Sequence, residues 1–220
     1  MTATEQRPTN DYTPGHGLIN WSDRLNINVY PSSQMNLLEL GQSIVSHGYG
    51  LVYGGGTKGL MGCVAQSVSK SGGHVIGITP KALAPVEVSG EAIGSNIEVP
   101  DMHTRKSMMN EKAGHSPAGA FIVLPGGYGT MEELLEITTW SQLNIHSKPI
   151  ILLNIRGYFD PLLLWIDRAV EEGFLAAGNR NILVACGTVD EAMAQLATYE
   201  APTSRYMGLK WTHPTSTDII

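Results

Sequence analysis

Short runs of branched apolar residues alternate with helical patterns along most of this chain, and no other feature of the sequence restricts its fold so much. Such runs, bounded by turn residues, predict strands, and the segments between them carry the apolar spacing of helices. The predicted strands cover residues 51–53, 74–79, 96–99, 120–124, 149–153 and 181–185, and the predicted helices lie around residues 34–47, 59–71, 103–114, 131–144, 158–173 and 188–198. Parallel neighbours need crossovers, which bury both faces of the sheet. The alternation predicts an α/β fold with a Rossmann-like, doubly wound, mostly parallel sheet and helices on both faces.

The two ends of the chain differ in composition from its middle. Residues 1–17 are polar and contain two prolines and two glycines, and residues 201–220 are again rich in Pro, Thr and Ser. We therefore expect a flexible N-terminus over 1–17, a single nucleotide-binding domain over 18–200 and a flexible C-terminal tail over 201–220. The first residues have neither the apolar core of a secretory signal nor the Arg-rich pattern of a transit peptide, which favours a cytoplasmic protein.

Composition and charge argue against several classes of partner. With 14 Lys and Arg against 20 Asp and Glu, the net charge is −6, so no basic field favours nucleic acid. No apolar run approaches the length of a membrane span. Cys63 and Cys186 lie far apart in apolar surroundings, without CxxC spacing or a histidine cluster, so we expect buried free thiols and neither a disulfide nor a metal site.

Two glycine-rich segments follow predicted strands. The sequence PGGYGT at 125–130 leads into a predicted helix, where backbone N–H groups can bind a phosphate and Thr130 can cap the helix. It has neither the Walker pattern nor the GxGxxG spacing. The sequence GGGTKG at 54–59 follows another strand. A single glycine cluster is equally consistent with a tight turn and with a phosphate-binding loop. Two such clusters at the carboxyl edge of one sheet favour a bound nucleotide.

Charged residues stand near the starts of two predicted helices. Arg105 and Lys106 lie where the helix dipole disfavours a cation by up to about 1 kcal/mol, which indicates an anionic ligand or an acidic partner. Glu132 and Glu133 are expected in the first turn of the next helix, where a carboxylate is favourable whether or not it does chemistry. Because the two strands are close in sequence, Arg105 and Glu133 are expected to converge on one cleft.

These residue types suit cleavage of a purine from ribose 5-phosphate. The transition state resembles an oxocarbenium ion and needs negative charge and an activated water, both of which a glutamate supplies. Glycine-loop amides and an Arg or Lys can bind the phosphate, while the departing base needs a hydrogen-bond donor or a proton. This chemistry requires no metal or redox cofactor.

The stretches DMHTRK at 101–106 and PGGYGTMEE at 125–133 resemble the paired signature of the Lonely Guy (LOG) family of cytokinin riboside 5′-monophosphate phosphoribohydrolases. Supporting stretches are LVYGGG at 51–56 with GLMG at 59–62, TTWSQL at 138–143, HSKP at 146–149, and LLN at 152–154 with GYFD at 157–160. The likeness covers roughly residues 34–175. It implies release of an N6-substituted adenine and ribose 5-phosphate from a nucleoside 5′-monophosphate, without a cofactor and usually by a homodimer.

The resemblance also implies roles for individual residues. Arg105 and Glu133 match the catalytic pair. The residues implied or expected to contact the substrate are Glu87, Lys106, Gly126, Gly127, Tyr128, Gly129, Thr130, Glu132, Thr138, Gly55 and Gly56. Nothing marks a pyridoxal-phosphate lysine, so a lysine decarboxylase, a label attached to such sequences, finds no support.

The chain departs from the family pattern near its start, and this keeps two alternatives open. Family members begin with a strand that ends in a Gly-Ser-Ser loop, whereas residues 18–40 here contain no glycine. The expected loop falls at 21–25, so the first strand is uncertain. The alternatives are a less selective nucleosidase that acts on AMP, and a nucleotide or cofactor carrier without catalysis, because a fold does not dictate chemistry.

Overall fold

A computed structural model describes residues 17–21, 31–88, 91–114 and 119–211, and it contains one parallel sheet of seven strands in the order β4-β3-β2-β1-β5-β6-β7. The strands are β1 (Gly17–Trp21), β2 (Gly50–Tyr53), β3 (Val75–Pro80), β4 (Ser95–Val99), β5 (Ala120–Val123), β6 (Ile150–Leu153) and β7 (Leu183–Cys186). Every pairing between neighbouring strands is parallel. The predicted doubly wound α/β fold is confirmed.

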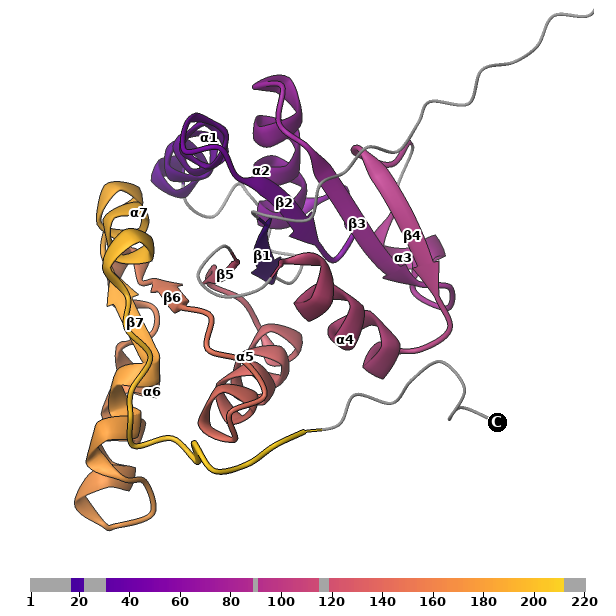
Figure 1. Cartoon of the computed structure of the whole chain (residues 1–220). Coiled ribbons are helices and arrows are strands. Elements are labelled where there is room, and N and C mark those ends of the chain that lie inside the picture. The colour runs from indigo at the N-terminus through magenta and orange to yellow at the C-terminus, as the bar shows by residue number, and fades with distance from the viewer. Residues whose placement is uncertain (1–16, 22–30, 89–90, 115–118, 212–220) are drawn as a thin grey trace, which may run out of the picture.

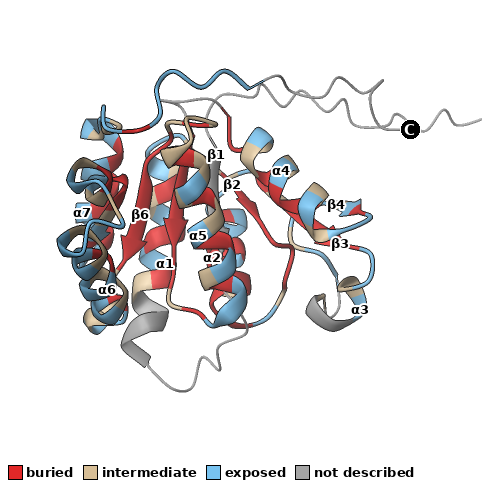
Figure 2. Cartoon of the chain, turned by 90° about the horizontal axis from the view of Figure 1, so that it is seen from below, coloured by how far each residue is buried: buried red, intermediate tan, exposed pale blue. Residues whose placement is uncertain are grey.

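Helices cover both faces of this sheet (Figure 1). One face carries α1 (Pro31–Ser46), α2 (Gly59–Lys70) and α7 (Val189–Thr198), and the other carries α4 (Met102–Lys112), α5 (Tyr128–Gln142) and α6 (Asp160–Glu171). The shorter elements are α3 (Ala84–Glu87) and the 3-10 helices η2 (Ile155–Gly157) and η3 (Ala177–Ile182). Buried residues concentrate on the strands and on the helix faces that touch them (Figure 2).

Strand residues alternate between the two layers of the core. In β2, Leu51 and Tyr53 pack with α1 and α2, while Val52 packs in the cluster that includes Met109 of α4 and Leu134 of α5. This is the two-residue period of a strand buried on both faces. The same continuous apolar character made the strands recognisable in the sequence.

The first strand lies at the centre of the sheet, between β2 and β5. Its position makes the gap between β1 and β5 the point where the strand order reverses, which is where doubly wound proteins bind ligands. Residues 22–30, which include most of the expected Gly-Ser-Ser loop position, lie outside the described residues. Strand β1 nevertheless forms without the family's glycine pattern.

The segment from Ala201, expected to be flexible from its composition, packs against the end of α5 as far as Trp211. Arg205 is buried, and its guanidinium donates to the carbonyls of Ser141 and His146 at 3.3 and 2.9 Å. Composition gave no sign of this, because a single buried arginine anchors a segment whose other residues are mostly exposed. Residues 212–220 lie outside the described part.

Other expectations from composition can be compared with the described residues. Cys63 and Cys186 are both free thiols; Cys186 is buried as expected, while Cys63 is only partly buried. Burial raises the pKa of both thiols. Among the described residues, no helix is long and apolar enough to span a membrane.

Candidate active site

The carboxyl edge of the sheet brings the sequence motifs together. Both glycine-rich segments begin there, one after β2 and the other after β5. Strands β4 and β5 are not neighbours, since three strands separate them. Helices α4 and α5 therefore do not meet through adjacent strands: α4 packs across β3, β2 and β1, and its Lys106 contacts Glu132 and Glu136 of α5 (Figure 1). That Arg105 and Glu133 share one cleft stays a prediction.

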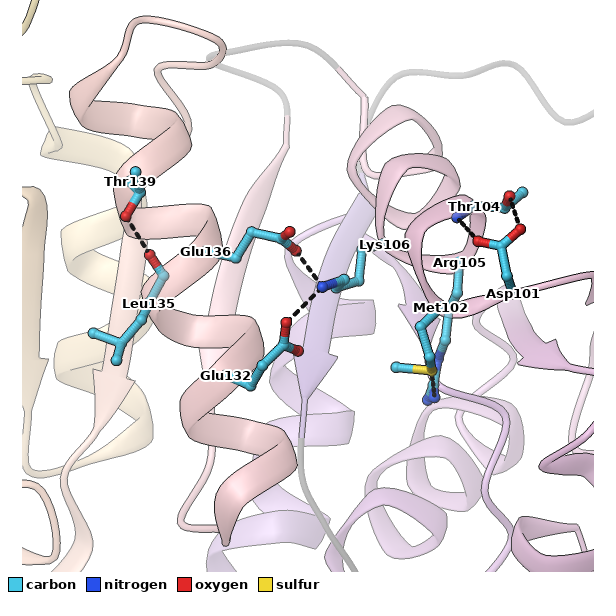
Figure 3. Close-up of polar contacts among 9 residues, drawn as sticks. All are labelled: Asp101, Met102, Thr104, Arg105, Lys106, Glu132, Leu135, Glu136 and Thr139. Atoms are coloured by element: carbon cyan, nitrogen blue, oxygen red, sulfur yellow. Dashed lines mark hydrogen bonds and ion pairs between the residues drawn. The ribbon is translucent and has the colours of Figure 1, made fainter. Parts of the chain in front are cut away.

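Helix α4 begins at a well-formed cap. The Asp101 carboxylate accepts hydrogen bonds from the backbone N–H and the hydroxyl of Thr104, both at 2.8 Å (Figure 3). The bond from the Thr104 N–H contributes most to lowering the pKa of Asp101. The cap fixes the register of α4 and places Arg105 at the end of its first turn, near the helix start as predicted.

The Arg105 side chain is 5% exposed and reaches the end of β2. Its Nη2 donates to the Gly54 carbonyl at 3.1 Å. A Cβ at position 54 would lie 2.0 Å from that nitrogen, so only glycine permits the contact. The Gly54 carbonyl also accepts from the Thr79 hydroxyl at 3.3 Å. Gly54 was not among the predicted site residues, because a run of three glycines does not reveal which one an arginine approaches.

Lys106 links the two helices that carry the predicted catalytic pair. Its side chain is 4% exposed, and Nζ lies 2.6 Å from Glu132 Oε1 and 2.8 Å from Glu136 Oε2 of α5 (Figure 3). Burial disfavours its charge, but the hydrogen bonds that Lys106 donates to the Glu132 and Glu136 carboxylates, together with their charges, outweigh burial and raise the pKa of Lys106. Since Lys106 follows Arg105 and Glu132 precedes Glu133, the ion pairs hold the predicted pair on adjacent helices.

The second glycine segment forms the start of α5. The helix begins at Tyr128, earlier than predicted, with Gly127 as its N-cap. Thr130, expected to cap the helix, is its buried third residue instead, and a Cβ at Gly126 would lie 2.1 Å from the Thr130 hydroxyl. Gly127, Tyr128 and Gly129 are exposed. The helix N-terminus therefore presents exposed backbone, as an anion site requires.

The early start of α5 corrects the expected position of its two glutamates. Glu132 and Glu133 are the fifth and sixth residues of the helix, and its first turn contains no acidic residue. Glu133 is 7% exposed and shares the inner face of α5 with Leu134 and Ile137. A glutamate on this face is poorly placed for dipole stabilisation, which weakens the structural explanation for its presence.

The other predicted residues have mixed surroundings. The Thr138 hydroxyl donates to the Leu134 carbonyl of its own helix at 2.7 Å. Gly55 and Gly56 are buried directly after Gly54. Glu87 is the last residue of α3, and its side chain lies outside the described part. No group of three or more His, Cys, Asp or Glu among the described residues could hold a metal ion.

Comparison with known proteins identifies the family. A protein-family model described as "Possible lysine decarboxylase" matches residues 61–196. The chain is 50% identical over 170 residues to the cytokinin riboside 5′-monophosphate phosphoribohydrolase LOG7 of Arabidopsis thaliana, covering 77% of this chain and 76% of that protein. The chain belongs to the LOG family. A probable LOG phosphoribohydrolase of Oryza sativa subsp. japonica, LOGL2, is 49% identical over 175 residues, which cover 79% of this chain and 70% of that protein.

Solved structures share the fold of this LOG-family chain. The X-ray structure of TM1055 aligns with a TM-score of 0.60 and 23% identity, covering 84% of this chain and 99% of that one. A molybdenum cofactor carrier protein from Chlamydomonas reinhardtii aligns with a TM-score of 0.58 and 18% identity, again over 84% and 99%. Identities this low concern the fold alone, so they do not distinguish a LOG enzyme from a carrier.

Proposed function

We propose that this chain hydrolyses the N-glycosidic bond of cytokinin riboside 5′-monophosphates and releases an N6-substituted adenine and ribose 5-phosphate. The main support is its identity of about one half to named phosphoribohydrolases over three quarters of its length. The structure adds a matching arrangement: Arg105 and Glu133 lie on two helices joined by Lys106, and α5 begins with exposed backbone.

In the proposed reaction, the bond between C1′ of the ribose and a ring nitrogen of the base breaks, and the oxygen of a water bonds to C1′. Glu133 stabilises the positive charge that develops on the ribose and accepts a proton from the water. The base takes a proton from solvent at its ring nitrogen as it leaves, and Glu133 afterwards releases its proton to solvent, so the net reaction consumes one water. Burial strengthens the electrostatic effect of the Glu133 carboxylate, because less water screens it.

The substrate phosphate is assigned to the start of α5, from Gly126 to Thr130. Backbone N–H groups at a helix N-terminus favour an anion through hydrogen bonds and the helix dipole. Arg105 supplies a positive charge held in place by Gly54, and guanidinium groups suit phosphate geometry. Glu87, Glu132, Thr138, Gly55 and Gly56 remain proposed substrate contacts, while Lys106 is proposed to act by holding α4 against α5.

We also propose a cytoplasmic homodimer that binds no nucleic acid. Exposed apolar side chains on α5 and α6 support the dimer, among them Leu135, Leu164 and Trp165. Two free thiols agree with a reducing compartment. The net charge of −6 opposes binding to a polyanion. Light scattering of the purified protein tests the dimer directly.

A substrate panel tests the activity. Purified protein is incubated with isopentenyladenosine 5′-monophosphate, AMP and isopentenyladenosine, and free base is quantified by chromatography. The proposal predicts base release from the first compound, with little from the other two. Comparable release from AMP would identify a less selective nucleosidase. Release from none of the three would contradict hydrolysis and favour a carrier.

A further inference from the structure

The segment from Asn154 to Asp160, between β6 and α6, has no part in the proposed chemistry, yet it touches the phosphate-binding start of α5. The hydroxyl of Tyr158 donates to the Gly126 carbonyl at 2.6 Å. These residues are 32 positions apart in sequence. Gly126 is buried, and it stands directly before the exposed residues Gly127, Tyr128 and Gly129. The contact therefore lies immediately beside the proposed phosphate site.

Because a peptide bond is planar, the hydrogen bond from Tyr158 to the Gly126 carbonyl also sets the direction of the Gly127 N–H. In a trans peptide, the C=O and the following N–H point in opposite directions. The Gly126 carbonyl points at the Tyr158 hydroxyl, so the Gly127 N–H points away from it. Glycine dihedrals are otherwise loosely restricted, and two glycines in succession leave this peptide plane free to rotate. The tyrosine hydroxyl removes that freedom.

The segment that carries Tyr158 is itself held firmly. The Asn154 side chain accepts from the Phe159 N–H and donates to the Asp160 carboxylate, both at 2.7 Å. The Asn154 N–H donates to the Cys186 carbonyl in β7 at 2.8 Å, which ties the segment to the sheet. The buried ring of Phe159 packs edge-on against the Tyr158 ring, with centroids 5.2 Å apart. Tyr158 is thus fixed independently of the loop that it contacts.

We propose that Tyr158 is a positioning residue for substrate binding: its hydroxyl fixes the Gly126–Gly127 peptide so that the Gly127 N–H is directed at the 5′-phosphate. The proposal rests on the proposed function of the α5 N-terminus. It explains the stretches LLN at 152–154 and GYFD at 157–160, which the chemistry leaves without a role. It also makes Tyr158 a determinant of preference for phosphorylated over unphosphorylated nucleosides.

The substitution Tyr158→Phe tests the proposal, since it removes one hydroxyl and keeps the ring that packs on Phe159. We expect KM for isopentenyladenosine 5′-monophosphate to rise about five- to tenfold, in line with one lost hydrogen bond, while kcat stays within about twofold. The inhibition constant of ribose 5-phosphate should rise by the same factor, and that of the free base should not change. Tyr206→Phe, at the opposite end of α5, is the matched control and should leave all these values unaltered.

Two results would overturn the proposal. Unchanged KM and ribose 5-phosphate inhibition in Tyr158→Phe would show that the peptide needs no anchor. If inhibition by ribose 5-phosphate and by free base weakened equally, the whole site would be disturbed, as expected for a tyrosine with only a structural role. Thermal denaturation of both variants measures whether a loss of stability contributes to any change in KM or in the inhibition constants.

A binding measurement separates this proposal from the proposed hydrolysis. Calorimetric titration of inorganic phosphate and of ribose 5-phosphate into wild-type and Tyr158→Phe protein requires no turnover. If the wild type binds phosphate but cleaves no nucleotide, the proposed hydrolysis is wrong. A weaker affinity for phosphate in Tyr158→Phe would still support the positioning role of Tyr158. If the wild type binds neither compound, the phosphate site and the role of Tyr158 both fail.

Discussion

The two ends of α5 are treated in opposite ways by the rest of the protein. At its N-terminal end, Gly127, Tyr128 and Gly129 are exposed. At its C-terminal end, the Ser141, Gln142 and Leu143 carbonyls accept hydrogen bonds from the Arg205 guanidinium, the Tyr206 N–H and the Trp211 indole, respectively. All three donors belong to the C-terminal segment that composition predicted to be flexible. One end is thus open to solvent and the other is closed by protein.

We infer that this difference separates groups used for stability from groups proposed to bind a ligand. Every α-helix leaves N–H groups at its start and C=O groups at its end without partners in the helix. A guanidinium at the carbonyl end satisfies hydrogen bonds and complements the negative end of the helix dipole. The exposed start keeps its positive end accessible to an anion. The predictions below test whether activity and stability divide between the two ends in this way.

The largest effect is expected from Glu133→Gln, near the open end. The substitution keeps the shape of a buried side chain but removes its charge, so kcat should fall by roughly 10²- to 10⁴-fold, the usual contribution of a general base. Stopped assays of base release give kcat, and urea unfolding should differ by less than about 1 kcal/mol. The exposed Glu172→Gln serves as control. A fully active Glu133→Gln enzyme would remove this residue from the mechanism.

The opposite pattern is expected from Arg205→Met at the closed end. The variant keeps much of the side-chain volume but leaves the Ser141 and His146 carbonyls without this donor, which should cost about 3 kcal/mol in the free energy of unfolding. At a temperature where the variant is folded, kcat should stay within about twofold. Lys210→Met, in an exposed part of the same segment, should change neither quantity. If Arg205→Met lost turnover but kept its stability, activity and stability would not divide between the two ends of α5 as proposed.

A pH dependence of stability is expected from His146, which also lies at the closed end. Its Nε2 lies 2.9 Å from the Ile137 carbonyl, and its Nδ1 accepts from the Lys148 N–H at 3.2 Å, so the neutral ring protonated at Nε2 satisfies both contacts. Burial, followed by the charges of Lys148 and Arg205, lowers the pKa of His146 to about 4, although the bond to Ile137 opposes the shift. Burying the ring therefore favours its neutral form.

The sign of the effect follows from this lowered pKa. Between the unfolded value near 6.5 and the folded value near 4, the unfolded chain binds the extra proton, so stability falls as the pH falls through that window. Through His146, the free energy of unfolding should fall by about 2 kcal/mol between pH 7 and pH 5. Urea unfolding of wild type and His146→Gln at both pH values measures it. If the free energy of unfolding fell equally in both proteins between pH 7 and pH 5, the pKa of His146 would not be lowered by folding.

The smallest effect is expected from Lys106→Met. Without the cation, the Glu132 and Glu136 carboxylates face each other beside the predicted catalytic pair, and kcat/KM should fall roughly fivefold. The loss is modest because Glu132 is 55% exposed and water screens its charge. Added salt should reduce the difference from wild type, since it screens the two carboxylates. A loss as large as that of Glu133→Gln would instead place Lys106 in direct contact with the substrate.

Local sequence patterns predicted the elements of this fold but not how distant elements meet. The apolar runs located six strands, and β2, β3, β5 and β6 are buried along nearly their whole length, as such runs indicate. The central strand β1 was uncertain, since its partners β2 and β5 are distant in sequence and the sequence after it lacks the family's glycines. The position of Glu133 on the inner face of α5 was also missed, because three residues of the glycine motif turned out to be helical.

The same limit applies to the candidate site. Motif matching named Arg105 and Glu133, but nothing in the sequence indicated that Gly54 must be a glycine for Arg105 to lie where it does. Likewise, the hydrogen bond from Tyr158 to Gly126 joins two motifs that the sequence presents separately. Such contacts depend on tertiary geometry, whereas a motif records only which residues are neighbours along the chain.

The late position of Arg205 in the chain has a consequence for synthesis. Helix α5 precedes β6 and β7 in the chain, whereas the groups that close its carbonyl end follow the last strand of the described sheet. A nascent chain that has completed every described strand of the sheet still lacks the groups that close the carbonyl end of α5. The closing residues must then dock on a body that is already assembled, so we expect the final gain in cooperativity to come after the ribosome has finished the last strand.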